Sequence, residues 1–301
     1  MHELCISGIV IKILITGANG QLGQSLLHLP DPEKVIDWLA TDYPDPDITD
    51  RNQVETYIAR SKPDFLVNCA AYTAVDQAEK EPGKAMSING NGPGILAGAC
   101  RKAGIPFIHI STDYVFAGRG CIPYLESDPV DPASVYGKSK LEGELEVIKS
   151  GSGIIVRTSW LYSEYGKNFL LTMLRLGAER ESLGIVMDQV GSPTYAGDLA
   201  KGIVTMIRQI HKGDFHIDRP VIYHFCNAGV ASWYDFASTI MRITGLNCKI
   251  KPIRTEEYPL PASRPAFSVM DTRKFSRDFN FDMPYWQDSM KICLENVQLQ
   301  K

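Results

Sequence analysis

The chain has 301 residues, of which 44% are hydrophobic and 22% are charged, a composition typical of a folded globular protein. Its net charge is -4, from 31 Lys and Arg against 35 Asp and Glu, with no long basic run, which argues against binding to nucleic acid or to a membrane surface. The seven cysteines and six histidines show no metal-ligand or disulfide spacing, so we predict reduced thiols, a cytoplasmic protein and no bound metal.

An apolar stretch at residues 4–15 could be mistaken for a targeting segment. It has no basic leader and no small-residue cleavage site, and it is too short to span a bilayer. We therefore expect residues 1–7 to form an irregular extension that leads into the first strand.

A glycine-rich turn follows the first predicted strand, residues 11–16, and precedes a predicted helix, residues 24–29. Gly17, Gly20 and Gly23 are spaced Gly-x-x-Gly-x-x-Gly. A strand, a glycine turn and a helix in this order present backbone amides to a pyrophosphate. The context predicts a dinucleotide-binding site here, although the glycine motif alone is weak.

The second predicted strand, residues 35–41, ends at Asp42. A carboxylate in this position can accept hydrogen bonds from an adenine ribose and repels a ribose phosphate, so it favours NADH over NADPH. The alternative is that Asp42 serves only as a turn residue before the proline-rich residues 43–46.

Two further strand and helix units follow. Asp50 is a predicted helix cap, and the apolar residues 65–68 read as a buried strand. Small residues come directly after this strand, so a cofactor could lie against the backbone of residues 69–73. A helix at residues 84–103 contains Pro93, at which we expect a kink.

The next predicted strand, residues 106–110, delivers Ser111 and Thr112 at its carboxyl end, where open parallel sheets bind ligands. Tyr136 and Lys140 are four residues apart, so on a helix they share one face and can point into one cavity. A nearby cation favours phenolate and lowers the pKa of a tyrosine, which suits a general acid or base. Thr112 would add a hydroxyl to polarise a carbonyl. Tyr-x-x-x-Lys also occurs by chance, so its meaning depends on the preceding motifs.

The regular alternation weakens after a strand at residues 153–157. Asp198 is a predicted cap for a helix that ends near residue 210, and either Ser232 or Asp235 begins another helix. The remaining expectations are a helix at residues 169–178, a loop at 192–194, a strand at 221–226 and loops through 251–282.

This order predicts an α/β fold with a doubly wound parallel sheet (Rossmann) and a smaller, interleaved C-terminal substrate lobe. We expect residues 8–160, with a return segment at about 198–226, to form the dinucleotide-binding domain. Residues 161–197 and 227–301 would form the substrate-binding lobe.

Three motifs together resemble the extended short-chain dehydrogenases/reductases: the glycine turn after Thr16, Ser-Thr-Asp-Tyr-Val-Phe at residues 111–116, and Tyr-x-x-x-Lys at Tyr136. More closely, three stretches resemble the dTDP-4-dehydrorhamnose reductase family. They are Asn-Cys-Ala-Ala-Tyr-Thr-Ala-Val-Asp-Gln-Ala-Glu at residues 68–79, Arg-Thr-Ser-Trp-Leu-Tyr at 157–162 and Arg-Pro-Ala-Phe-Ser at 264–268. The likeness extends over residues 11–286.

The resemblance implies roles for individual residues. Thr112, Tyr136 and Lys140 correspond to the catalytic triad. The residues implied to bind the cofactor are Gly17, Gly20, Gln21, Leu22, Gly23, Asp42, Asp47, Ala71, Tyr72, Thr73, Tyr136 and Lys140. Those implied to contact substrate are Thr112, Asp113, Tyr136, Trp160 and Arg264, although an arginine before a proline can equally be a solvated surface residue.

The resemblance implies reduction of dTDP-4-dehydro-6-deoxy-L-mannose to dTDP-L-rhamnose by NADPH or NADH, the last step of dTDP-rhamnose synthesis. Another nucleotide-sugar reductase, epimerase or dehydratase is an alternative, although Tyr114 follows Asp113 where a dehydratase has a glutamate. A regulatory subunit of methionine adenosyltransferase is a second alternative. Ser25 occupies the place of a carboxylate that holds magnesium in some relatives, so we expect a monomer or homodimer without a metal link.

Overall fold

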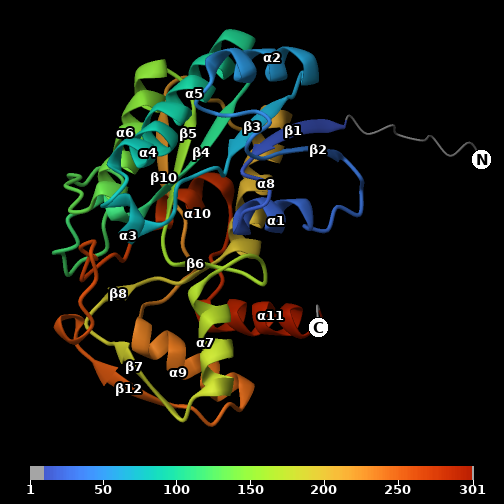
Figure 1. Ribbon diagram of the computed structural model, residues 1–301. Coiled ribbons are helices and arrows are strands. Elements are labelled where there is room, and N and C mark those ends of the chain that lie inside the picture. Colours follow the sequence, from blue (N-terminus) through green and yellow to red (C-terminus); the bar gives the residue numbers. More distant parts are fainter. Residues whose placement is uncertain (1–9, 300–301) are drawn as a thin grey trace, which may run out of the picture.

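The computed structural model describes residues 10–299, and the predicted extension at residues 1–7 lies outside them. A six-stranded sheet forms the centre, in the order β10-β5-β4-β3-β1-β2, and every pairing in it is parallel (Figure 1). The strand order reverses beside β1, because β2 lies on one side of it and β3 on the other. The strands are β1 (Ile11–Thr16), β2 (Ile36–Thr41), β3 (Phe65–Asn68), β4 (Phe107–Thr112), β5 (Ile154–Thr158) and β10 (Val221–His224).

Helices cover both faces of this sheet, which is why its central strands are apolar on both sides. In β1, Ile13 and Ile15 belong to one buried cluster, while Leu14 belongs to another on the opposite face. The helices that contribute to the first cluster are α1 (Gln21–Leu27), α8 (Ala196–Lys212) and α10 (Arg273–Phe279). Those that contribute to the second are α2 (Arg51–Ser61), α5 (Gly92–Ala103) and α6 (Val135–Ser150). The doubly wound sheet predicted from the sequence is therefore confirmed.

A separate buried cluster lies below the sheet in Figure 1. It includes residues of α7 (Phe169–Glu179), α9 (Trp233–Thr244) and α11 (Trp286–Leu299), and of the paired strands β7 (Ser182–Val186) and β12 (Lys249–Ile253). Four two-residue strands form two further pairs: β6 (Leu161–Tyr162) pairs with β9 (Thr194–Tyr195), and β8 (Val190–Gly191) pairs with β11 (Ala231–Ser232). How the chain divides into two lobes stays a prediction.

Side-chain caps fix several helix starts. Asp50 accepts hydrogen bonds from the amides of Asn52 and Gln53, as predicted. Ser232 is the N-cap of α9, and its side chain and backbone exchange hydrogen bonds with Asp235. The two residues that were predicted as alternative helix starts therefore form one capping box. The sequence therefore located the start of α2 to the residue and narrowed the start of α9 to two candidates, of which Ser232 is the cap.

The prediction that Asp198 caps α8 is wrong. The helix begins two residues earlier, at Ala196, and Asp198 lies in its first turn. The Asp198 carboxylate is buried and accepts hydrogen bonds from Asn227 and Ser289. Asn227 follows β10 and Ser289 lies in α11, so the carboxylate links these two segments to α8 instead of capping a helix.

Two irregular regions also differ from expectation. Pro93 lies at the start of α5, and the irregularity comes before it, as a π-helical segment, η1 (Ser87–Asn91), that follows α4 (Pro82–Met86). Residues 251–282 were expected to be loops, yet they contain most of β12 and all of α10. The short elements that remain are α3 (Val75–Ala78) and the 3₁₀ turns η2 (Asp113–Val115) and η3 (Thr255–Glu257).

Candidate active site

A cavity of about 1320 Å³ lies at the carboxyl ends of the parallel strands. The last residues of four of these strands line it: Thr16, Thr41, Thr112 and Thr158. This is the edge at which the strand order reverses, the usual ligand site of an open α/β sheet. The volume exceeds the roughly 300–1,000 Å³ of a typical small-molecule pocket, so two ligands can share it.

The glycine turn lies at one wall of the cavity, and all five of its predicted contact residues line it: Gly17, Gly20, Gln21, Leu22 and Gly23. Gly17 has a φ of 72°, and a Cβ there would lie 2.5 Å from the backbone nitrogen of Ala70. Any side chain would therefore separate the turn from the end of β3. Because the turn has no side chains at its glycines, its backbone borders the cavity directly. A pyrophosphate could therefore approach the backbone amides closely.

Asp42 lies beside this turn. Its carboxylate accepts hydrogen bonds from the backbone amides of Asn19 and Tyr43, both at 2.8 Å. Asp42 and Asp47, the two residues predicted to contact the adenosine half of the cofactor, both line the cavity. Asp42 thus has a structural role in joining two loops, and this role is compatible with a ribose contact.

The segment after β3 borders the cavity through Ala71 and Thr73. Tyr72 lies between them but is not among the described residues that line the cavity. Its hydroxyl donates to Glu81 at 2.7 Å, and its backbone amide donates to the buried Asn89. Tyr72 therefore anchors this segment, and only its neighbours face the open space.

Tyr136 and Lys140 come from the first turns of α6, which Ser134 caps by accepting the amide of Gly137. Both line the cavity together with Thr112. Gly137 is required here, because a Cβ on it would lie 2.3 Å from the carbonyl oxygen of Tyr114. The close approach of helix and loop brings the three predicted catalytic side chains to one cavity.

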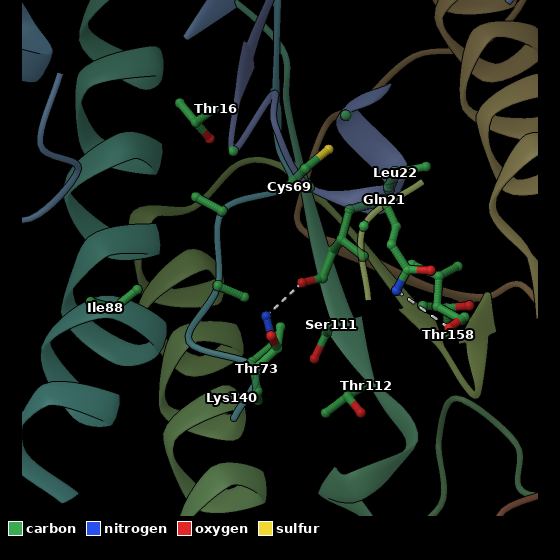
Figure 2. A pocket seen from close by; sticks show the side chains of 18 of the residues that line it. Thr16, Gln21, Leu22, Cys69, Thr73, Ile88, Ser111, Thr112, Lys140 and Thr158 are labelled. Atoms are coloured by element: carbon green, nitrogen blue, oxygen red, sulfur yellow. Dashed lines mark hydrogen bonds between the residues drawn. The ribbon is translucent and has the colours of Figure 1, made fainter. Parts of the chain in front are cut away.

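The prediction that a nearby cation lowers the pKa of Tyr136 is wrong. Burial raises the pKa of Tyr136 to about 12, a hydrogen bond with Thr112 acts in the opposite direction, and the negative charge of Asp113 raises it further. The Lys140 ammonium instead donates to the backbone oxygen of Ile110 at 2.6 Å (Figure 2). Tyr136 is therefore protonated at neutral pH, the state that a proton donor requires.

Lys140 is almost completely buried, with 2% of its surface exposed. Burial lowers its pKa to about 8, and the negative charge of Glu144 acts in the opposite direction. Lys140 thus carries its charge at neutral pH but loses it under mildly alkaline conditions.

Asp113 is also buried beside Thr112, whose hydroxyl donates to it at 3.0 Å. Burial raises the pKa of Asp113 to about 6, whereas the nearby Ser268 hydroxyl and the hydrogen bond from Thr112 act in the opposite direction. Asp113 lines the cavity and is ionised at neutral pH, so it can accept hydrogen bonds from a sugar hydroxyl.

The two remaining predicted substrate residues differ in position. Trp160 lines the cavity with its backbone at a φ of 48°, a conformation that costs a residue with a side chain about 1 kcal/mol or more. Arg264 is not among the described cavity-lining residues. It forms two hydrogen bonds with Asp76, at 2.6 and 2.7 Å, and these raise the pKa of Arg264 against the effect of burial.

The family model described as "RmlD substrate binding domain" matches residues 11–299, almost the whole chain. The chain belongs to this RmlD family. A dTDP-4-dehydrorhamnose reductase from Aggregatibacter actinomycetemcomitans is 42% identical over 287 residues, which cover 93% of this chain and 97% of the relative.

Two solved structures of dTDP-4-dehydrorhamnose reductases agree with the RmlD assignment. One, from Clostridium acetobutylicum, has a TM-score of 0.88 and 41% identity, and covers 96% of this chain and 100% of that one. The other, from Bacillus anthracis in complex with NADP, has a TM-score of 0.88 and 38% identity, and covers 95% and 99%. A UDP-glucose 4-epimerase from Thermotoga maritima, at 17% identity and a TM-score of 0.78, shares the fold alone.

The donor set of this RmlD chain is suited to a nicotinamide dinucleotide. Backbone of the glycine turn, the Asp42 carboxylate and the Lys140 amine all border one long cavity. Within residues 10–299, no three His, Cys, Asp or Glu side chains are grouped as a metal site. No helix in the same range is long and apolar enough to cross a membrane.

Sequence reasoning missed several cavity residues. Trp233 begins α9 and lines the cavity opposite the sheet, and Lys167 and Asn168 line it just before α7. Asn168 donates to the Gln21 amide oxygen at 3.0 Å, which links the glycine turn to α7. No local motif marks these residues, because long-range folding brings them to the site.

Proposed function

We propose that the protein catalyses the NAD(P)H-dependent reduction of dTDP-4-dehydro-6-deoxy-L-mannose to dTDP-L-rhamnose. The observation that carries the proposal is the meeting of Thr112, Tyr136 and Lys140 at one wall of a cavity that the glycine turn also borders. Relatives about 40% identical over nearly their full length are named dTDP-4-dehydrorhamnose reductases, which supports this substrate.

The bound nicotinamide cofactor supplies the hydride to the keto carbon. Tyr136 donates its phenolic proton to the oxygen that becomes a hydroxyl, so negative charge does not build up there. Thr112 donates a hydrogen bond to the same oxygen. Lys140, at the same wall of the cavity, holds the nicotinamide ribose. The pKa of Tyr136, raised to about 12, keeps the phenol protonated at neutral pH, so its proton is available for this step.

For cofactor binding, we propose the residues that line the cavity near the glycine turn. Gly17, Gly20 and Gln21 would contact the pyrophosphate, and Asp42 the adenine ribose. Since a carboxylate repels a 2′-phosphate, we propose that the protein uses NADH at least as well as NADPH. A relative crystallised with NADP argues for acceptance of both.

For the sugar nucleotide, we propose that Asp113 and Trp160 contact the deoxysugar and that Arg264 contacts the diphosphate. Arg264 would have to leave Asp76 or share its charge between the two partners. We also propose a cytoplasmic monomer or homodimer.

The test is incubation of the purified protein with dTDP-4-dehydro-6-deoxy-L-mannose and either reduced cofactor, followed by loss of nicotinamide absorbance and identification of the product. The proposal expects turnover that requires added reductant and yields dTDP-L-rhamnose. Turnover without added reductant would indicate an epimerase. No turnover with any ketosugar, together with co-purification of a methionine adenosyltransferase, would favour the regulatory role.

A further inference from the structure

Beneath the Tyr136 and Lys140 site lies a buried ion pair that the mechanism does not use. Glu144 on α6 accepts hydrogen bonds from Arg157 on β5, with Nε at 2.9 Å and Nη2 at 2.6 Å. The two side chains are 1% and 3% exposed. A buried pair of this kind costs desolvation free energy and is a weak source of stability, so its presence calls for another explanation.

The pair is attached to the strand that carries the active site. Ser111 on β4 donates to the Glu144 carboxylate at 2.5 Å, while the preceding residue, Ile110, accepts the Lys140 ammonium at 2.6 Å. Lys140 and Glu144 are four residues apart and therefore on one face of α6. Two consecutive residues of β4 thus hold two side chains that lie one helical turn apart on α6. Figure 2 shows Lys140 pointing toward this strand, on which Ser111 lies.

Glu144 is also the anion that faces Lys140. Burial raises the pKa of the Cys69 thiol to about 12, so this neighbour stays neutral. Burial and the charge of Lys140 keep the pKa of His109 well below its usual value, so this imidazole is neutral as well. The Glu144 carboxylate is therefore the charge that raises the pKa of Lys140 against the effect of burial. The titratable groups that face the ammonium are Cys69 directly after β3, His109 of β4 and Glu144 of α6, and Arg157 of β5 is the partner of Glu144.

We propose that Glu144, held by Arg157 and Ser111, is a positioning residue that keeps the Lys140 ammonium charged and directed at the end of β4. The proposal rests on the proposed function, because it assigns Lys140 a role in catalysis. Arg157 fixes the carboxylate, and the aromatic ring of Phe116, 5.0 Å from the guanidinium, supports Arg157 in turn.

The test compares Glu144→Gln with Glu146→Gln. Glu146 lies on the same helix but pairs with the exposed Lys149 at 2.9 Å, so it is a matched control for loss of one carboxylate. The first measurement is the titration of Lys140 in the ligand-free protein, by NMR of ¹³Cε-lysine, with the signal assigned by its absence in Lys140→Arg. We expect Glu144→Gln to lower the midpoint by about one pH unit, Glu146→Gln to leave it unchanged and Glu144→Asp to restore it.

The second measurement is the pH dependence of kcat/KM for ketosugar reduction, whose alkaline limb should move to lower pH by the same amount. If Glu144→Gln leaves Arg157 unpaired and does not fold, the double variant Glu144→Gln/Arg157→Met removes both charges. Its expected shift has the same direction but is smaller, because loss of the guanidinium opposes loss of the carboxylate. An unchanged or higher Lys140 midpoint in a folded variant would overturn the proposal. Since the NMR titration needs no substrate, a normal titration shift without ketosugar turnover would overturn the proposed function alone.

Discussion

Trp160 and Trp233 stack face to face, with ring centroids 3.6 Å apart and ring planes within 3° of parallel. Trp160 follows β5, whereas Trp233 begins α9, so the stack joins the sheet to the cluster of helices below it (Figure 1). Phe169 packs on the other side of Trp233, with ring centroids 4.7 Å apart. The stack holds the strained backbone of Trp160 at the cavity wall.

Trp233→Ala should therefore loosen Trp160. Aromatic pairs contribute about 0.5–1.5 kcal/mol beyond their buried area, so we expect KM for the nucleotide sugar to rise about 3- to 10-fold. The KM for the reduced cofactor should change less. Steady-state kinetics with each substrate varied in turn checks this, with Trp233→Phe as the conservative control. Equal effects on both KM values would argue against a local role at the sugar end.

Turnover should fall on the alkaline side of neutrality. The pKa of Lys140 is lowered to about 8, so the ammonium loses its charge as the pH rises through this value. The pKa of Tyr136, raised to about 12, lies too high to cause such a fall. A pH profile of kcat/KM should show the decrease above about pH 8, and a flat profile up to pH 10 would contradict the role of Lys140.

The buried lysine should also make the ligand-free protein less stable at neutral pH than at alkaline pH. Its pKa is lower in the folded protein, at about 8, than the usual 10.5, so the stability it contributes is present above about pH 10.5 and is lost as the pH falls through 8. Lys140→Met should consequently raise the free energy of unfolding at pH 7 by roughly 1–3 kcal/mol while abolishing turnover. Urea denaturation at pH 7 measures this. Destabilisation by the same substitution would show that the hydrogen bond to Ile110 outweighs the burial of charge.

Cofactor preference should depend on Asp42. Asp42→Ala removes the carboxylate that would repel a 2′-phosphate, so the ratio of kcat/KM for NADPH to that for NADH should rise about tenfold. Asp45→Ala is the control, because Asp45 is exposed in the same loop. If the ratio is unchanged in Asp42→Ala, the carboxylate only joins Asn19 to Tyr43 and does not face the ribose.

The sequence was most informative where function depends on neighbouring residues. The glycine turn, the Ser111 and Thr112 strand end and the Tyr136 helix are each local, and each lies where its pattern predicted. One element that the sequence did not predict depends on a distant partner. The strand β12 contains Lys249, Lys251 and Pro252, which are unfavourable in strands, so its sequence does not indicate a strand. It forms by pairing with β7, almost 70 residues earlier.

The electrostatics of the site were the least predictable from sequence. The spacing of Tyr136 and Lys140 indicated a shared helix face, but the pKa of Tyr136 depends on burial by many elements and on Asp113. Glu144 carries no motif of its own, and its relation to Lys140 becomes visible only when β4, β5 and α6 are placed side by side. Burial and long-range contacts determine which of these groups are charged. The spacing of residues along the sequence shows neither.

The measurement that tests the central claim most directly is single-turnover reduction of the ketosugar by Tyr136→Phe compared with the unaltered protein. Loss of the proton donor should reduce the rate about 10²- to 10⁴-fold, while the dissociation constant of the reduced cofactor, measured by fluorescence, stays within about threefold. Thr112→Ser, which keeps the hydroxyl, should retain most of the rate. A Tyr136→Phe rate close to that of the unaltered protein would contradict the account, because the phenol would then not be the proton source.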